Sequence, residues 1–192
     1  MCPSVDHPKS AVNLAELLGL FHGGDHQKLA SFVSVDGRSL PHPYGKLLDH
    51  DWHMTVAVES HFESPVDVIV VRTQKDDEWY SREILLTSQA DGLVVQYGIV
   101  RIRYGMLSAP VWGEIEGGAK PLGRVLIEHD VLRQVELVGL WRLKCGETLA
   151  GRFSANAGDV TYGRTARIFC DSEPAIELLE VIRPLAAGSR FR

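Results

Sequence analysis

The sequence from Tyr162 to Pro184, YGRTARIFCDSEPAIELLEVIRP, predicts a hairpin of two β-strands around which the rest of the chain can be interpreted. We expect the strands at Tyr162–Cys170 and Ala175–Ile182. Residues Asp171–Pro174 suit the turn between them, because Asp and Ser side chains bond to nearby backbone groups and Pro fixes φ.

Glu180 is the unusual residue of the later strand. Alternate residues of a strand share one face, so this carboxylate lies with Leu178 and Ile182. Burying a carboxylate is costly unless it is paired or hydrogen-bonded. Either this face of the strand meets water, or Glu180 has a partner or a ligand.

Arg82 presents the same problem on a second strand, expected at Trp79–Thr87, where it alternates with Tyr80 and Ile84. Three explanations fit an Arg and a Glu on apolar faces of separate strands. They form one buried ion pair, they lie on a solvent-exposed face of the sheet, or they line a cavity for a polar ligand.

The remaining pattern favours an α+β protein with an antiparallel sheet, because strands come in adjacent hairpins while helices gather early and in the middle of the chain. Helices are expected after Asn13, in two pieces within Pro43–Phe62, and at Pro110–Glu116 and Leu122–Glu128. Further strands are expected at Val66–Thr73, Leu93–Tyr104 and Val131–Lys144, the last with a bulge or bend at Gly139. Residues Gly146–Val160 are polar and contain glycine, so they predict a loop or flexible flap.

Composition limits the class of protein. A chain of 192 residues fits one domain, and its net charge of -5 argues against a nucleic-acid or anionic-membrane partner. Three cysteines without CxxC spacing favour a reducing, cytoplasmic location. We expect a soluble protein, because no signal-peptide pattern opens the chain and no apolar run reaches membrane-spanning length.

Metal and nucleotide sites are not predicted. His50, His53 and His61 are close in sequence, but no cysteine or carboxylate set completes a recognised ligand spacing. The glycine-rich stretch Gly117–Gly123 lacks the residue order of a phosphate-binding loop.

Four short motifs, in this order, resemble the chorismate pyruvate-lyase family. They are Trp79-x-x-Arg-Glu-Ile-Leu-Leu86, Lys120-Pro-Leu-Gly-Arg124, Tyr162-Gly-Arg164, and Glu180 before Pro184. The resemblance begins near Leu47 and ends at Pro184. It implies a single chorismate lyase-like domain over residues 1–192, in which residues 1–42 are an N-terminal extension. It also implies a six-stranded antiparallel sheet with helices on one side and a ligand in a buried cavity under helical flaps.

The resemblance also implies roles for particular residues. Arg82 matches the arginine that holds the aromatic carboxylate. Leu122, followed by Gly123, matches a turn whose backbone amide helps to hold the same carboxylate. Glu180 matches the carboxylate that faces the ring oxygen from which enolpyruvate leaves. Met54 is similar to a methionine that lines the pocket. The guanidinium fork of an arginine suits a planar carboxylate.

This chain differs from the family in one motif. The family usually has a second arginine after a glycine on the third strand, whereas Ile99 follows Gly98 here. Arg101 or Arg103 would substitute only if the strand shifted, because a slip of one residue turns every side chain to the other face.

Our first hypothesis is a lyase that eliminates pyruvate from chorismate, or a similar ring carboxylate, to give a hydroxybenzoate without a metal or organic cofactor. The alternative is a non-catalytic binding domain for a small aromatic carboxylate, since the same fold resembles the effector-binding domains of some bacterial transcription regulators. A third option is a structural protein in which Arg82 and Glu180 merely pair. In the first two hypotheses the partner is a small-molecule carboxylate, and the chain is a monomer or dimer.

Overall fold

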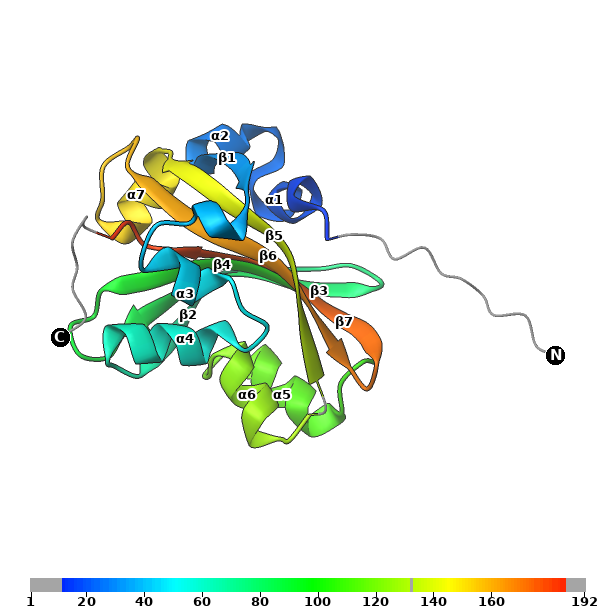
Figure 1. Cartoon of the computed structure of the whole chain (residues 1–192). Helices are drawn as coiled ribbons and strands as arrows, with labels where there is room; N and C mark the ends of the chain where they lie inside the picture. The colour runs from blue at the N-terminus through cyan, green and yellow to red at the C-terminus, as the bar shows by residue number, and fades with distance from the viewer. Residues whose placement is uncertain (1–11, 132, 186–192) are drawn as a thin grey trace.

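A computed structural model describes residues 12–131 and 133–185 and shows an α+β domain built on one antiparallel sheet (Figure 1). The spatial order of the strands is β1-β5-β6-β7-β4-β3-β2. The strands are β1 (Ala30–Val35), β2 (Val66–Lys75), β3 (Trp79–Ser88), β4 (Val94–Arg103), β5 (Arg133–Cys145), β6 (Val160–Cys170) and β7 (Glu173–Ile182). The expected fold class is confirmed, and the sheet has seven strands where six were predicted.

The additional strand is β1, which pairs with β5 at the edge of the sheet. Only Ala30 of this strand is buried, and Val33 is 59% exposed. A strand that buries so little has no clean alternation of apolar and polar residues, which is why its sequence did not predict it.

The hairpin of β6 and β7 is tighter than expected. Its turn consists of Asp171 and Ser172, which both have positive φ, at 51° and 70°. Two such residues suit a two-residue hairpin turn, because that backbone twist matches the twist of the strands. Pro174 therefore lies inside β7, where the register shifts opposite Phe169. A bulge tolerates proline because it leaves one residue out of the hydrogen-bonded ladder.

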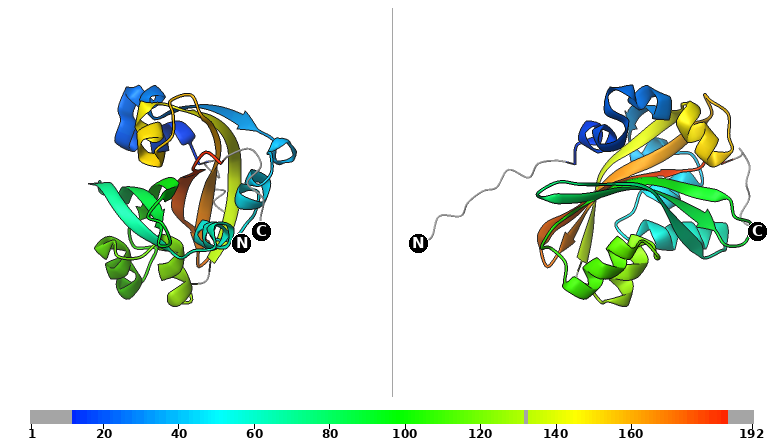
Figure 2. Two further views of the ribbon diagram at one scale, coloured as in Figure 1. Left: turned by 90° about the vertical axis from the view of Figure 1, so that its left-hand side faces the viewer. Right: turned by 180° about the vertical axis from the view of Figure 1, so that it is seen from behind.

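Helices cover both faces of the sheet, so the expectation of helices on one side was wrong. One group lies above the sheet in Figure 1: α1 (Leu14–His22), α2 (His26–Leu29) and α7 (Glu147–Phe153). The other group comprises α3 (Tyr44–Leu48), α4 (Met54–Phe62), α5 (Ala109–Gly117) and α6 (Leu122–Glu128). The two further views in Figure 2 show the twist of the sheet and the same separation of the helices.

The segment Gly146–Val160 contains α7, which corrects the prediction of a loop or flap. Leu149, Ala150 and Phe153 are buried, and this spacing places them on one face of the helix. A Cβ on Gly146 would lie 2.3 Å from the carbonyl oxygen of Lys28, so this glycine permits the close approach of α7 to α2. Gly146, one of the glycines that suggested a flexible loop, therefore serves packing instead.

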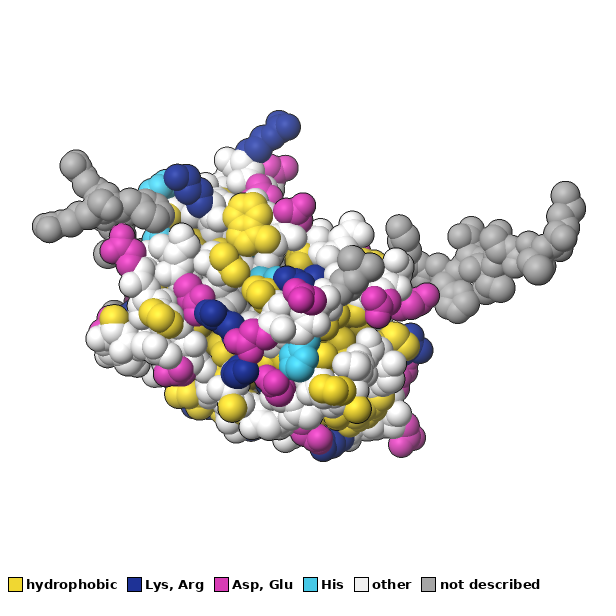
Figure 3. All heavy atoms as spheres, turned by 90° about the horizontal axis from the view of Figure 1, so that it is seen from below, with side chains coloured by type: hydrophobic (Ala, Val, Ile, Leu, Met, Phe, Trp, Pro, Cys, Tyr) yellow, Lys and Arg dark blue, Asp and Glu magenta, His cyan; other side chains and the backbone are white. Residues whose placement is uncertain are grey.

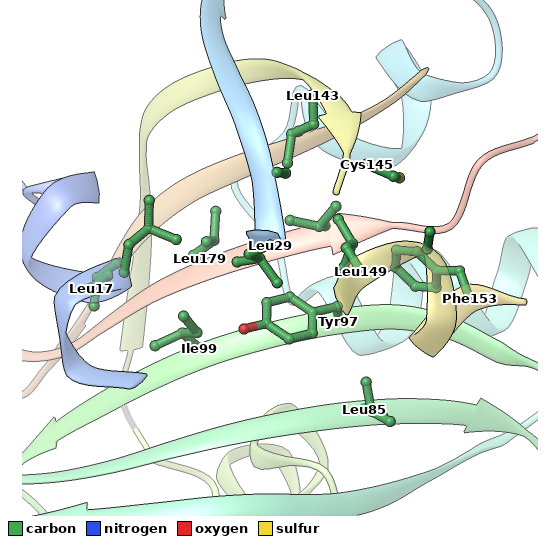
Figure 4. Close-up of a cluster of buried hydrophobic side chains, with 14 of the residues drawn as sticks. Leu17, Leu29, Leu85, Tyr97, Ile99, Leu143, Cys145, Leu149, Phe153 and Leu179 are labelled. Atoms are coloured by element: carbon green, nitrogen blue, oxygen red, sulfur yellow. The ribbon is translucent and has the colours of Figure 1, made fainter. Parts of the chain in front are cut away.

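Alternate residues of the central strands form a core beneath α1, α2 and α7 (Figure 4). Leu85, Tyr97, Ile99 and Leu179 come from β3, β4 and β7, and they pack with Leu17, Leu29, Leu149 and Phe153 from the helices. Residues 12–42 therefore contribute to the core rather than only preceding the domain, while residues 1–11 lie outside the described part.

The opposite face of the sheet packs against α3–α6 in two apolar clusters. One contains Ile102 and Ile176 with Ile115 of α5 and Val125 of α6. The other contains Leu86 and Ile182 with side chains of α3 and α4. The candidate site lies where these two clusters meet.

Several smaller predictions are confirmed. Asn13 caps α1, since its side chain accepts hydrogen bonds from the N–H groups of Ala15 and Glu16. The register of β5 shifts between Leu137 and Gly139, as a bulge at Gly139 predicts. Within the described ranges, no helix is long and apolar enough to cross a membrane.

Candidate functional site

A narrow, partly enclosed cavity of about 30 Å³ lies between the sheet and the beginnings of α4 and α6. Its lining residues are His53, Met54, Thr55, Ile84, Leu86, Gln96, Gly98, Val100, Pro121, Leu122, Gly123, Ile168, Leu178 and Glu180. Four of the five predicted site residues are therefore brought together: Met54, Leu122, Gly123 and Glu180.

The floor of the cavity is a row of residues across three strands. Ile84 of β3 pairs with Gly98 of β4, which pairs with Glu180 of β7. A Cβ on Gly98 would lie 3.1 Å from Cγ1 of Ile84, so the glycine allows the Ile84 side chain to pack over the middle of this row. On the helical side, a Cβ on Gly123 would lie 2.9 Å from Oγ1 of Thr55, so this glycine allows α6 to approach α4.

Arg82 lies two residues before Ile84 on β3 and does not itself line the cavity. It pairs with Val100, which does line it. The side chain is 0% exposed, and its Nη1 donates a hydrogen bond to the carbonyl oxygen of Ile115 at 3.0 Å. Among the described residues, its Nε and Nη2 have no hydrogen-bond partner.

The charge on Arg82 is therefore poorly compensated. Burial lowers the pKa of this guanidinium, and the neighbouring Tyr80 opposes the shift. An arginine stays protonated in a protein, since its ordinary pKa lies above 12. Arg82 is thus a buried cation with two free donor groups beside a cavity, which is the arrangement that an anion would relieve.

Glu180 is paired with Arg164 and not with Arg82. Nε of Arg164 donates to Oε2 of Glu180 at 2.7 Å, because the two residues lie directly opposite each other on β6 and β7. The ion pair between Arg82 and Glu180, which was one explanation of the sequence, is absent from the described structure. Glu180 still lines the cavity, with its partner beside it.

Arg164 also holds the segment between α3 and α4. Its Nη1 donates to the carbonyl oxygen of His50 at 3.0 Å, and its Nη2 donates to that of Trp52 at 3.3 Å. Arg164 and Arg167 lie on opposite faces of β6, and both are buried, at 1% and 5% exposed.

Two histidines next to the cavity act as acceptors for arginines. Nδ1 of His50 lies 3.1 Å from Nη1 of Arg164, and Nε2 of His53 accepts a hydrogen bond from Arg133. Burial, followed by these positive charges, lowers the pKa of each histidine to about 4. Within residues 12–131 and 133–185, no cluster of three or more His, Cys, Asp or Glu is placed to hold a metal ion.

No second arginine reaches the cavity from β4. Arg101 lies on the other face, where its Nε donates to Glu177 at 2.7 Å and its Nη2 donates to Glu16 at 3.0 Å. Arg103 pairs with Glu78 at 3.0 Å. The register of β4 is fixed by the pairing of Gly98 with Glu180, so the shift that would have turned these arginines inward does not occur.

Gln96 is a cavity residue that the sequence interpretation missed. It is 2% exposed, it lines the cavity, and its Oε1 has no hydrogen-bond partner in the part of the chain that the structure describes. The signal was available, because Gln96 is a polar residue that alternates with Gly98 and Val100 on the strand.

His53 separates the cavity from the surface. It lines both the narrow cavity and an outer depression of about 630 Å³, whose wall includes Arg133 and Asp51. Farther out, acidic and basic side chains intermingle over α5 and α6 (Figure 3). Lys120, for example, pairs with both Glu114 and Glu128.

Comparison with known proteins finds likeness in structure only. No protein-family model matches the chain, and no curated protein matches its sequence. The effector domain of PhnF from Mycobacterium smegmatis matches with a TM-score of 0.51 at 13% identity, covering 73% of this chain and 91% of that domain. The structure of PhnF from the same organism matches with a TM-score of 0.50 at 13% identity, covering 73% of this chain and 65% of that one.

A further match is the "possible transcriptional regulator YydK" from Bacillus subtilis, with a TM-score of 0.46 at 11% identity. The alignment covers 61% of this chain and spans 57% of the YydK chain. At these identities the likeness concerns the fold alone. The chain therefore shares the fold of the PhnF effector domain, which is consistent with the chorismate lyase-like fold expected from the sequence.

Proposed function

We propose that this chain is a binding domain for a small carboxylate, in which Arg82 binds the carboxylate and the adjoining cavity receives the rest of the ligand. The observation that carries the proposal is the fully buried guanidinium with two donor nitrogens that have no partner among the described residues. A buried charge without a partner is strongly destabilising, and a carboxylate that accepts two parallel N–H bonds would offset that cost.

Ligand entry requires the helices to move. The cavity volume of about 30 Å³ has room for little more than a water molecule. Its movable wall is formed by the first residues of α4 and α6, namely His53–Thr55 and Pro121–Gly123. We place the entrance at His53, since this side chain borders both the cavity and the outer depression.

The fold likeness to an effector domain agrees with ligand binding as the function. The net charge of -5 argues against direct contact between this domain and nucleic acid. A regulatory role would therefore require DNA to be contacted by another part of the assembly.

Binding is tested by titrating the full chain with benzoate, 4-hydroxybenzoate, 3-hydroxybenzoate and chorismate, using calorimetry and the shift in melting temperature. We expect at least one ring carboxylate to bind and stabilise the protein. Arg82→Met should abolish that binding, whereas Arg103→Met, which removes an arginine from the surface pair with Glu78, should leave it unchanged. Undiminished binding by the Arg82→Met protein would refute the assignment.

A lyase is the second candidate, because the Glu180 carboxylate lines the same cavity as Leu122 and Gly123. An elimination of pyruvate needs a proton at the departing oxygen. The ion pair of Glu180 with Arg164 uses the ionised carboxylate, whereas an acid catalyst must carry a proton. We therefore favour binding over catalysis.

Incubation of the protein with chorismate separates the two candidates. Binding without release of pyruvate would support the binding domain. Pyruvate release by the wild type, lost in Glu180→Gln with the melting temperature retained, would establish the lyase.

A further inference from the structure

We propose that Gln96 is a specificity-determining residue, which selects carboxylates that carry a hydrogen-bond donor at the end remote from the carboxylate group. This inference rests on the proposed function and names the class of ligand. Its starting point is the side-chain amide of Gln96, which is buried on the cavity wall with an unpartnered Oε1 among the described residues.

The neighbours of Gln96 do not explain a polar side chain at this position. Its cross-strand partners are Leu86 on β3 and Ile182 on β7, and both are buried aliphatic residues. A buried acceptor without a donor costs stability, so an apolar residue would suit this part of the core better. A donor group brought by the ligand would satisfy Oε1 and offset that cost.

Arg82 and Gln96 lie on the same face of the sheet, on opposite sides of the pair formed by Ile84 and Gly98. Arg82 pairs with Val100 and Gln96 pairs with Leu86, so the two positions are four residues apart along the strands. At a rise of about 3.3 Å per residue, their backbones are separated by roughly 13 Å. Gly98 lies between them and contributes no side chain of its own, while the Ile84 side chain packs 3.1 Å from where its Cβ would be, so the body of a ligand would lie against Gly98 and Ile84.

This arrangement fits a ligand with two polar ends and an apolar middle. The carboxylate meets the guanidinium of Arg82, the apolar body lies over Gly98, and a hydroxyl or amino group donates to Oε1 of Gln96. A site built to hydrogen-bond a donor group rejects the analogue that lacks it, because its own polar atom is then left unpaired.

Four ring carboxylates that differ only at the para position test the inference: benzoate, 4-hydroxybenzoate, 4-aminobenzoate and 4-methoxybenzoate. Benzoate has no polar para group. The para groups of 4-hydroxybenzoate and 4-aminobenzoate donate a hydrogen bond, whereas the methoxy group of 4-methoxybenzoate can only accept one. Calorimetric titration of the full chain should give dissociation constants about tenfold lower for the hydroxy and amino compounds than for the other two.

Gln96→Met, which keeps a similar side-chain length, should bring the four constants to within about threefold of one another while benzoate still binds. Gln74→Leu is the matched control, because Gln74 is an exposed glutamine on β2, and this variant should keep the wild-type order of affinities.

Equal affinity of the wild type for benzoate and 4-hydroxybenzoate would overturn the inference and leave the proposed function standing. A preference for donors that persists in Gln96→Met would overturn it in the same way. The titrations of the wild-type protein with the four carboxylates test the inference on their own, even if the Gln96→Met protein fails to fold. Failure of the wild type to bind any carboxylate would overturn the proposed function, and the role of Gln96 with it.

Discussion

Two buried arginines of this sheet face are in opposite electrostatic situations. Arg164 donates to Glu180 and to the backbone carbonyls of His50 and Trp52. Arg82 donates to the carbonyl oxygen of Ile115 and interacts with Tyr80, but its Nε and Nη2 have no hydrogen-bond partner among the described residues. Arg164 therefore stabilises the ligand-free protein, whereas Arg82 destabilises it, as residues of binding sites often do.

Replacement of Arg82 by methionine should stabilise the ligand-free protein. Removing an uncompensated buried charge in favour of an unbranched apolar side chain should raise the free energy of unfolding by about 1–2 kcal/mol. Urea unfolding of the two proteins at neutral pH measures the difference. A loss of stability would mean that the free protein satisfies Arg82 in some other way.

The corresponding replacement of Arg164 is the contrasting control. Arg164→Met would leave the Glu180 carboxylate partly buried without its cation, and it would free two backbone carbonyls. We expect the free energy of unfolding to fall by about 3 kcal/mol. The two arginines should therefore shift the urea midpoint in opposite directions.

Turn residues and the spacing of hydrophobic residues predicted most helices and strands. These local patterns failed for elements whose structure depends on contacts with distant parts of the chain. The strands β2, β3 and β4 and the helices α4 and α6 follow from local pattern. The strand β1 did not, because its pairing with β5 depends on the edge of the sheet and buries little of its own surface. The helix α7 was obscured by Gly146 and Gly151, which suggest a loop when no partner helix is known.

The candidate site was predicted in the same partial way. Alternation along the strands placed Arg82 and Glu180 on apolar faces, and the structure puts both residues on the face that contains the cavity. The pairing of Glu180 with Arg164 depends on the exact hairpin register, which the two-residue turn at Asp171 and Ser172 sets. An expected turn of four residues does not specify that register.

The packing of α7 against α2 gives a prediction about glycine. In Gly146→Ala the new Cβ would lie 2.3 Å from the carbonyl oxygen of Lys28 and 2.6 Å from that of Gln27. Because both neighbours are backbone atoms, we expect the free energy of unfolding to fall by about 2–3 kcal/mol. Thermal or urea unfolding measures the loss.

Gly151→Ala is the matched control within the same segment. Gly151 is an exposed residue of α7, and a Cβ there would meet nothing within 4 Å. Alanine favours a helix over glycine, so this variant should gain about 0.5–1 kcal/mol. Equal effects of the two substitutions would contradict the close approach at Gly146.

At the scale of the whole molecule, stability should decline in mild acid. His50 and His53 have pKa values of about 4 in the folded protein, against an ordinary value of 6.5. As pH falls below 6.5, the two histidines bind protons in the unfolded chain but stay neutral in the folded protein. The free energy of unfolding should therefore fall between pH 6.5 and 4, by up to about 1.4 kcal/mol per pH unit for each histidine.

Urea unfolding at a series of pH values across that window measures the slope. The double variant His50→Gln and His53→Gln should show a flatter profile, even if it is less stable at neutral pH. His26→Gln, which alters an exposed histidine, should retain the wild-type slope. A wild-type profile that is flat down to about pH 5 would contradict neutral, buried histidines.

The alternation along β4 has a practical consequence. Gln96, Gly98 and Val100 line the cavity, whereas Tyr97 and Ile99 belong to the core beneath α1 and α7. Substitutions in the first set alter the shape and polarity of the cavity while the second set keeps the sheet packed. Under the proposed binding function, the domain would be a scaffold for engineered biosensors, in which these cavity-facing positions of β4 are varied in a library to change the molecule that is detected.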